Sequence, residues 1–136
     1  MILGVDPGER RIGLAVADLE TRFARPLEVI DRTVTDPIAR IVEVIAENGV
    51  TKVVVGRPVG LSGYEGPAME AQKTFLVSLR SSIEVEVDVY DERLTTVIAE
   101  RGMKMAGTSS KKRKELRDAV AAQVMLQGYM DSKLWH

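Results

Sequence analysis

The sequence contains no cysteine and a single histidine, His136, at the last of its 136 positions. The absence of cysteine excludes disulfide bonds and every metal site or nucleophile that depends on a thiolate. With one terminal histidine, a Ser-His-Asp triad or a histidine-bound zinc site is effectively excluded as well. Any chemical site must therefore be built from carboxylates, hydroxyl groups and basic side chains.

Aromatic residues make up only 4% of the chain, so stacking of bases on aromatic rings is not expected as the main means of recognition. The sequence lacks both an apolar run of about 18 residues and a signal-peptide pattern, and we expect a cytoplasmic protein. Its length and its 45% hydrophobic content are typical of one globular domain, residues 1–136. The net charge of −1 indicates no particular partner.

The first residues predict two antiparallel strands joined by a tight turn. A short apolar strand ends on Asp6, an Asp-Pro-Gly turn follows, and residues 12–17 run back as the second strand. Alternation puts Asp6 on the same face as Ile2 and Gly4, and the missing side chain of Gly4 leaves room beside the carboxylate. A carboxylate there is costly unless it is paired or binds a cation. These residues alone are equally compatible with an ordinary turn that carries no chemistry.

The rest of the chain predicts a mixed α/β sheet with helices on both faces. Asp36 is expected to cap a helix that starts at Pro37 and ends at Asn48. Continuous valines predict a buried strand at 52–56, and alternating valines predict an edge strand at 85–89. The other expected elements are a strand at 25–30, a loop at 57–66, and helices from Pro67, at 94–105 and, after a flexible break at 107–110, at about 112–131. The residues expected on the inner faces of the first two helices are Ile38, Ile41, Val42, Ile45, Ala68, Ala71, Phe75, Leu76 and Leu79.

Three motifs end strands that this topology makes parallel. They are Asp6, Gly56-Arg57 and Asp91-Glu92-Arg93. Because ligands of such sheets bind beyond the carboxyl ends of the strands, we expect all three motifs along one rim.

Asp118 is an acidic residue on the apolar side of the last helix, in line with Ala122, Met125 and Tyr129. A buried carboxylate needs a partner, and alanines around it would let this helix approach the sheet near Asp6. One interpretation is a structural ion pair with Arg117, Arg93 or a nearby lysine. The other interpretation is a bound cation. Three acidic positions would point at one place, namely Asp6, Asp91 or Glu92, and Asp118, and their carboxylates would repel one another without a cation. We favour a site for Mg²⁺ or Mn²⁺, which prefer oxygen ligands.

Basic residues surround the same rim. A lysine-rich run at the start of the last helix opposes the helix dipole but suits phosphate binding. For most such runs a solubilising surface is the simpler account, and here the placement favours a polyanion. The candidate nucleic-acid-binding residues are Arg10, Arg11, Arg57, Arg93, Lys111, Lys112, Arg113 and Lys114.

Four motifs in order resemble the YqgF/RuvX family over nearly the whole chain. They are Leu3-Gly4-Val5-Asp6-Pro7-Gly8 with Arg11-Ile12-Gly13-Leu14-Ala15, Val54-Val55-Gly56-Arg57-Pro58, Asp91-Glu92-Arg93-Leu94-Thr95-Thr96, and Asp118-Ala119-Val120-Ala121-Ala122. The resemblance implies a ribonuclease-H-like fold related to the RuvC resolvases. This fold has a five-stranded mixed sheet, with a three-stranded antiparallel meander and two parallel strands.

The resemblance also implies that Asp6, Glu92 and Asp118 are the catalytic, metal-binding carboxylates. Related resolvases carry an acid where this chain has Gly56, and the resemblance implies that the Asp91-Glu92 pair substitutes for it. We favour Glu92 over Asp91 for its place in the motif and its longer reach.

The implied function is a metal-dependent nuclease that processes the 5′ end of pre-16S rRNA, or alternatively a Holliday junction resolvase. A non-catalytic nucleic-acid-binding factor for ribosome assembly is the alternative from another class. RNA and a four-way DNA junction are both polyanions held mainly through phosphates, and no base-reading motif separates them. Cleavage of a two-fold symmetric junction would suit a homodimer.

Overall fold

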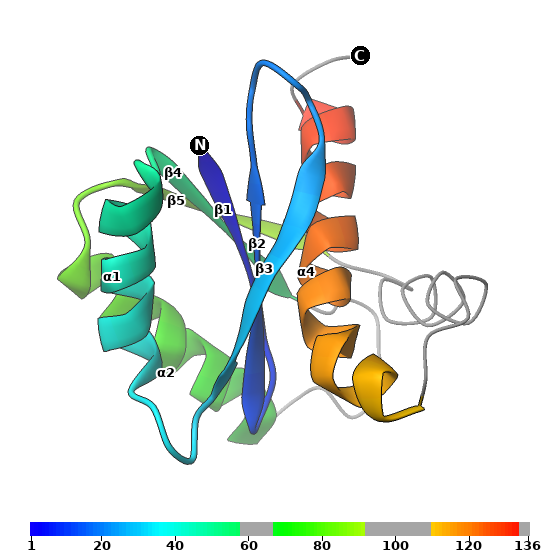
Figure 1. The fold of residues 1–136 in the computed structure, drawn as a ribbon. Coiled ribbons are helices and arrows are strands. Elements are labelled where there is room, and N and C mark those ends of the chain that lie inside the picture. Colours follow the sequence, from blue (N-terminus) through cyan, green and yellow to red (C-terminus); the bar gives the residue numbers. More distant parts are fainter. Residues whose placement is uncertain (58–66, 92–109, 134–136) are drawn as a thin grey trace.

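The computed structural model describes residues 1–57, 67–91 and 110–133 (Figure 1). The elements in chain order are β1 (Ile2–Pro7), β2 (Arg11–Ala17), β3 (Ala24–Asp31), α1 (Pro37–Asn48), β4 (Lys52–Arg57), α2 (Pro67–Ser82), β5 (Glu86–Asp91) and α4 (Ser110–Lys133). The expected helix at 94–105 lies outside these residues, as do most of the expected loop at 57–66 and all but Ser110 of the break at 107–110. The basic run at 111–114 is part of helix α4.

The five strands form one mixed sheet in the order β3-β2-β1-β4-β5. Strands β1, β2 and β3 are an antiparallel meander, whereas β4 pairs parallel with both β1 and β5. Val5 pairs with Val55, and Arg57 pairs with Asp91, so β1, β4 and β5 end along one rim. The meander, the parallel pairs and the common rim expected from the sequence are confirmed.

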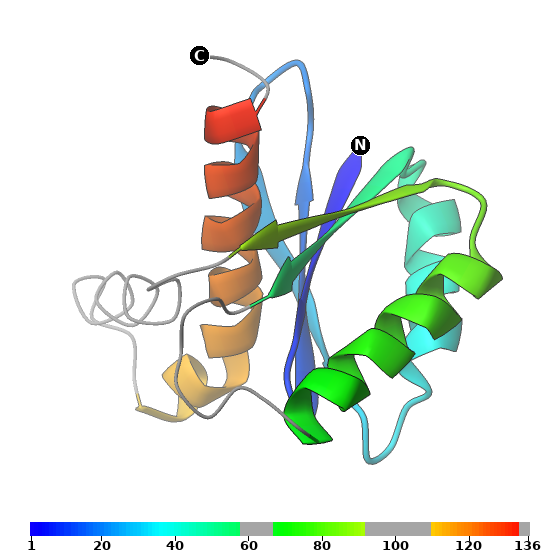
Figure 2. The ribbon, with the colours of Figure 1, turned by 180° about the vertical axis from the view of Figure 1, so that it is seen from behind.

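The sheet lies between two layers of helix (Figures 1 and 2). Helices α1 and α2 cover one face, where Leu3, Val5 and Leu14 belong to one buried cluster with helix residues such as Ile41. Helix α4 covers the other face and packs on a second cluster. That cluster consists of Ile2, Ala15, Ala17, Ala24, Val54, Ala122, Met125, Leu126, Tyr129 and Met130. No helix that the structure describes is long and apolar enough to cross a membrane.

Local signals located α1 correctly, but one of its expected inward-facing positions, Val42, was wrong. The Asp36 carboxylate accepts hydrogen bonds from the backbone of Ile38 and Ala39, and Gly49 ends the helix with a left-handed backbone, φ 62°. Val42 is 40% exposed, because the inner stripe of α1 runs through Val44 instead.

On α2, Ala71 is exposed and its neighbour Gln72 is buried. The side-chain amide of Gln72 donates a hydrogen bond to the Gly56 carbonyl at 3.2 Å, which stabilises the polar group inside the protein. Gln72, which forms a hydrogen bond to the end of β4, is therefore the buried residue at the position where the apolar pattern predicted Ala71.

A polar cluster joins α4 to β5 and β4 within the otherwise apolar interface. Tyr129 donates a hydrogen bond to Asp88 Oδ2 at 2.9 Å, and the Lys52 ammonium lies 4.0 Å from the same oxygen and 5.2 Å from the Tyr129 ring centre. Burial alone would raise the pKa of Asp88, but the bonds from Tyr129 and the Val89 N–H, with the Lys52 charge, outweigh it and lower that pKa. The cluster therefore stabilises the ionised form of Asp88.

We predict that Tyr129→Phe lowers the free energy of unfolding by about 1 kcal/mol at neutral pH, because it removes one hydrogen bond and keeps the ring. The pKa of Asp88 is lower in the folded state than its usual 3.8, so this stabilisation is complete above that value and is lost as pH falls through the folded pKa. Urea unfolding from neutral to acidic pH measures the difference. A difference between the two proteins that stays constant into acid would contradict the role of Asp88.

Candidate functional site

The candidate site begins at the end of β1, where Asp6 is half-buried and pairs with Gly13 of β2. Ile2 belongs to the cluster under α4, and a Cβ atom on Gly4 would lie 2.9 Å from Leu126 Cβ of that helix. Strand alternation puts Asp6 on the same face as these two residues. The carboxylate therefore belongs to the α4 side of the sheet, as the sequence predicted.

Helix α4 touches the sheet directly opposite Asp6. A Cβ atom on Gly13 would overlap the carbonyl oxygen of Asp118 and lie 3.0 Å from the backbone nitrogen of Ala119. Only glycine therefore fits at this position of β2. Since Gly13 is the strand partner of Asp6, the contact brings the backbone of Asp118 to the end of β1.

The Asp118 side chain forms an ion pair with a basic residue of β2. Its Oδ2 atom lies 2.9 Å from Arg11 Nε, and the two side chains are 24% and 38% exposed. Oδ2 itself is buried, yet it accepts no hydrogen bond from the residues that the structure describes. From the sequence we expected either a structural ion pair with Arg117, Arg93 or a lysine, or a bound cation. The ion pair exists, but its partner is Arg11.

The other predicted acidic residues are at or beyond the end of β5. Asp91 is the last residue of that strand, and Glu92 and Arg93 lie outside the described residues. Within the described part of the chain, no three acidic or histidine side chains form a group able to hold a metal ion. The set of three carboxylates therefore stays a prediction. Of its members, Asp6 lies in the β1–β2 strand pair, and the backbone of Asp118 contacts that pair at Gly13.

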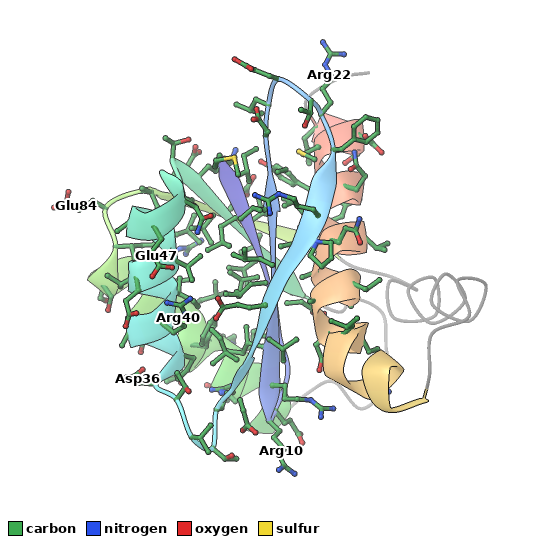
Figure 3. All side chains as sticks on the ribbon, in the orientation of Figure 1. Arg10, Arg22, Asp36, Arg40, Glu47 and Glu84 are labelled. Carbon is green, nitrogen blue, oxygen red and sulfur yellow. The ribbon has the colours of Figure 1, made fainter. Side chains whose placement is uncertain are left out.

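The basic residues predicted around the rim separate into three groups. Arg10 and Arg11 follow the Asp6 turn, and Arg57 is exposed at the end of β4. The backbone of Lys111, Lys112, Arg113 and Lys114 forms the beginning of α4, at the same end of the molecule as the β1–β2 turn (Figure 1). Figure 3 labels Arg10 at this end.

Arg32, which was not among the residues expected from the sequence, supports the turn after Asp6. Its backbone N–H donates to the Arg10 carbonyl at 2.8 Å, and its guanidinium donates to the Gly8 carbonyl at 2.9 Å. The same guanidinium lies 5.7 Å from the centre of the Phe75 ring of α2. Its place directly after the third predicted strand of the meander was a usable signal, because an antiparallel neighbour of β2 must end near the start of β2.

Asp31 is another carboxylate at this end, and it is already hydrogen-bonded. Its Oδ1 accepts hydrogen bonds from the Thr33 hydroxyl at 2.6 Å and the Thr33 N–H at 2.9 Å. These bonds, with smaller contributions from the charges of Arg10 and Arg11, lower the pKa of Asp31. Asp31 therefore serves the turn after β3.

The arrangement of sheet and helices is similar to that of known junction resolvases. A structure of Thermus thermophilus RuvC in complex with a Holliday junction substrate aligns over 97% of this chain and 96% of its own, with a TM-score of 0.58 and 22% identity. The Fowlpox virus resolvase, in complex with Holliday junction DNA, covers 98% of both chains with a TM-score of 0.61 and 15% identity. The ribonuclease-H-like fold implied by the sequence is confirmed.

The family follows from closer relatives. The family model described as "RuvX: Holliday junction resolvase" matches residues 1–132. A "Putative pre-16S rRNA nuclease" of Chloroflexus aggregans is 43% identical over 133 residues, 97% of this chain and 94% of the relative. A protein of the same name from Bacillus cytotoxicus is 42% identical over 135 residues, 97% and 98% of the two chains. The chain therefore belongs to the RuvX family, and the predicted class of enzyme, a nuclease, is confirmed.

The contact at Gly13 predicts a strong effect of the smallest substitution. Gly13→Ala should lower the free energy of unfolding by about 3 kcal/mol or more, because the new methyl group meets helix backbone that cannot rotate away. Gly128→Ala in α4 is the matched control, since its Cβ would be 3.4 Å from the Tyr90 hydroxyl and alanine favours a helix. Chemical denaturation of both variants measures the effect. Equal stability of Gly13→Ala and the wild type would show that α4 does not depend on this contact.

Proposed function

We propose that this protein is a metal-dependent nuclease that hydrolyses phosphodiester bonds. Its active site would lie at the end of β1, with Asp6 and Asp118 among its catalytic carboxylates. The observation that carries the proposal is the contact of α4 with Gly13, the strand partner of Asp6. This contact brings the backbone of Asp118 next to the strand partner of Asp6. An ordinary Asp-Pro-Gly turn would need no such contact.

The residues at this position suit a hard divalent cation. Carboxylate oxygens are the ligands that Mg²⁺ and Mn²⁺ prefer, and the buried Oδ2 of Asp118 has no hydrogen bond from the described residues. Asp6 and Asp118 would hold the cation, which when bound activates water and neutralises charge on the phosphate. Glu92 is proposed as the third ligand on the sequence motif alone, in preference to Asp91.

The protein's own contribution is to hold these groups rigidly and to attract the phosphate backbone. The strand pairing of Asp6 and the helix contact at Asp118 come from packed elements, which restrict the movement of the carboxylates. Arg10 and Arg57 are exposed on the same rim and would bind phosphates on either side of the cleaved bond. Arg93 and the basic start of α4 are proposed to extend this path.

The substrate that we favour is the 5′ region of pre-16S rRNA, which would give the protein a role in ribosome biogenesis. Support comes from the curated relatives above 40% identity, whose names refer to that RNA. A four-way DNA junction is the second candidate, supported by the family description and by the bound substrate of the RuvC structure. A homodimer would suit the second substrate, and the cytoplasmic location expected from the sequence accompanies both.

We predict that Asp6→Asn abolishes cleavage and retains nucleic-acid binding, because Asp6 supplies a metal ligand rather than a phosphate contact. Labelled pre-rRNA and a labelled four-way junction are incubated with the protein, each in Mg²⁺, in Mn²⁺ and in EDTA, and binding is measured in parallel. Glu20→Gln is the matched control, because Glu20 is an exposed acid in the β2–β3 connection. Full cleavage by Asp6→Asn would overturn the proposal, and retained binding without cleavage by the wild type would favour the non-catalytic alternative.

We predict further that neutralising Lys111, Lys112, Arg113 and Lys114 to glutamine weakens binding to all sequences alike. If all four side chains contact phosphates of single-stranded RNA, the slope of log affinity against log salt should become shallower by up to about 3. Filter binding at several salt concentrations measures both slopes. Parallel salt lines for the two proteins would mean that this run is only a solvated surface.

A further inference from the structure

Arg11 is the counter-cation of Asp118 in the protein without metal. It belongs to β2, two residues before Gly13, and alternation puts it on the same face of the sheet as that glycine. From there its Nε reaches Asp118 Oδ2 at 2.9 Å. Its positive charge therefore lies beside the carboxylate to which we assign the metal.

Arg11 and Asp118 form an ion pair without a hydrogen bond between them. Oδ2 is within ion-pair distance of Nε, but the N–H group does not point at it well enough to form a hydrogen bond. Ion pairs that lack a good hydrogen bond and retain solvent contact are weak. A divalent cation with carboxylate ligands can compete with such a pair for Asp118.

The choice of partner also indicates a specific role. Asp31 is the residue directly opposite Arg11 in the β2–β3 pairing, and its carboxylate is bonded to Thr33 instead. Arg11 of the sheet thus forms its ion pair with Asp118 of helix α4, and not with its neighbour Asp31 within the sheet. Arg10, its neighbour on the exposed side of the same turn, has no ion pair with any described residue.

We propose that Arg11 takes the place of the cation at Asp118 in the metal-free protein, and that metal binding displaces it toward the phosphate of the substrate. This inference rests on the metal site assigned under the proposed function. The displaced guanidinium has a planar set of donors suited to a phosphate group. Metal loading and phosphate binding are thereby coupled, since each favours the arrangement in which Arg11 has left Asp118.

The test is the affinity for Mn²⁺ alone, measured by calorimetry on wild type, Arg11→Gln, Arg10→Gln and Asp118→Asn. Both arginine variants lose one positive charge from the same turn, but only Arg11→Gln loses the competing ion pair. We expect Arg11→Gln to bind Mn²⁺ more tightly than Arg10→Gln by roughly twofold to fivefold, the range of a weak, partly exposed ion pair. Asp118→Asn should bind weakly.

Three outcomes would overturn the proposal. Equal affinities of the two arginine variants would mean that Arg11 acts only through its general charge. Weaker binding by Arg11→Gln would mean that Arg11 supports Asp118 as a metal ligand. If the wild type binds no Mn²⁺, the metal site itself is wrong, so the failure of the proposed function is distinguished from that of this inference.

A second measurement follows the wild-type protein directly and needs a variant only to assign one signal. Nitrogen-detected NMR resolves the Nε–H groups of arginines, and Arg11→Lys identifies the Arg11 signal by its loss. Saturating Mg²⁺ should shift the Arg11 signal and speed its hydrogen exchange, while the Arg10 signal changes little. An Arg11 signal that stays unchanged when the amide of Asp6 has responded to Mg²⁺ would contradict displacement.

Discussion

The close contact between α4 and the β1–β2 strand pair is the constraint on which the rest of the structure depends. Glycines at positions 4 and 13 remove the side chains that would separate helix and sheet, and alanines on the helix complete the approach. Close packing of this kind gains dispersion energy and leaves little freedom to shift. The position of Asp118 relative to Asp6 is therefore a consequence of core packing, and no mobile loop is needed to bring their backbones together.

The fold followed from local patterns because each pattern had a direct physical cause. The Asp36 cap, the valines of β4 and the alternation in β5 act through backbone bonding and burial, which a single sequence reveals. The approach of the Asp118 backbone to the β1–β2 strand pair was predictable for the same reason. The partner of Asp118 was not, because the pairing of Arg11 across the layer depends on the exact height of α4 over the sheet. Val42 and Ala71 were wrong because helical spacing alone does not determine which neighbouring turn faces the core.

The two faces of the sheet have different roles. The face under α1 and α2 is lined by large aliphatic residues and contains the main apolar cluster. The face under α4 combines small residues with Tyr129, Asp88 and Lys52 at β5 and with the ion pair at Asp118. Polar groups in a layer of low dielectric specify geometry more strictly than apolar contacts do. The side to which we assign the chemistry is accordingly the side with the more exacting contacts.

The order of the elements along the chain has a consequence for synthesis. Helix α4, which covers one whole face of the sheet and bonds the β3 edge through Gln123 and Gln127, is the last described element. A nascent chain emerges from its N-terminus, so the strands are available well before this helix. Until α4 is made, the small-residue face of the nascent sheet lacks this helix, and Asp118 has not yet reached the strand pair of Asp6. Asp118 can therefore reach the strand pair of Asp6 only after all five strands have been synthesised.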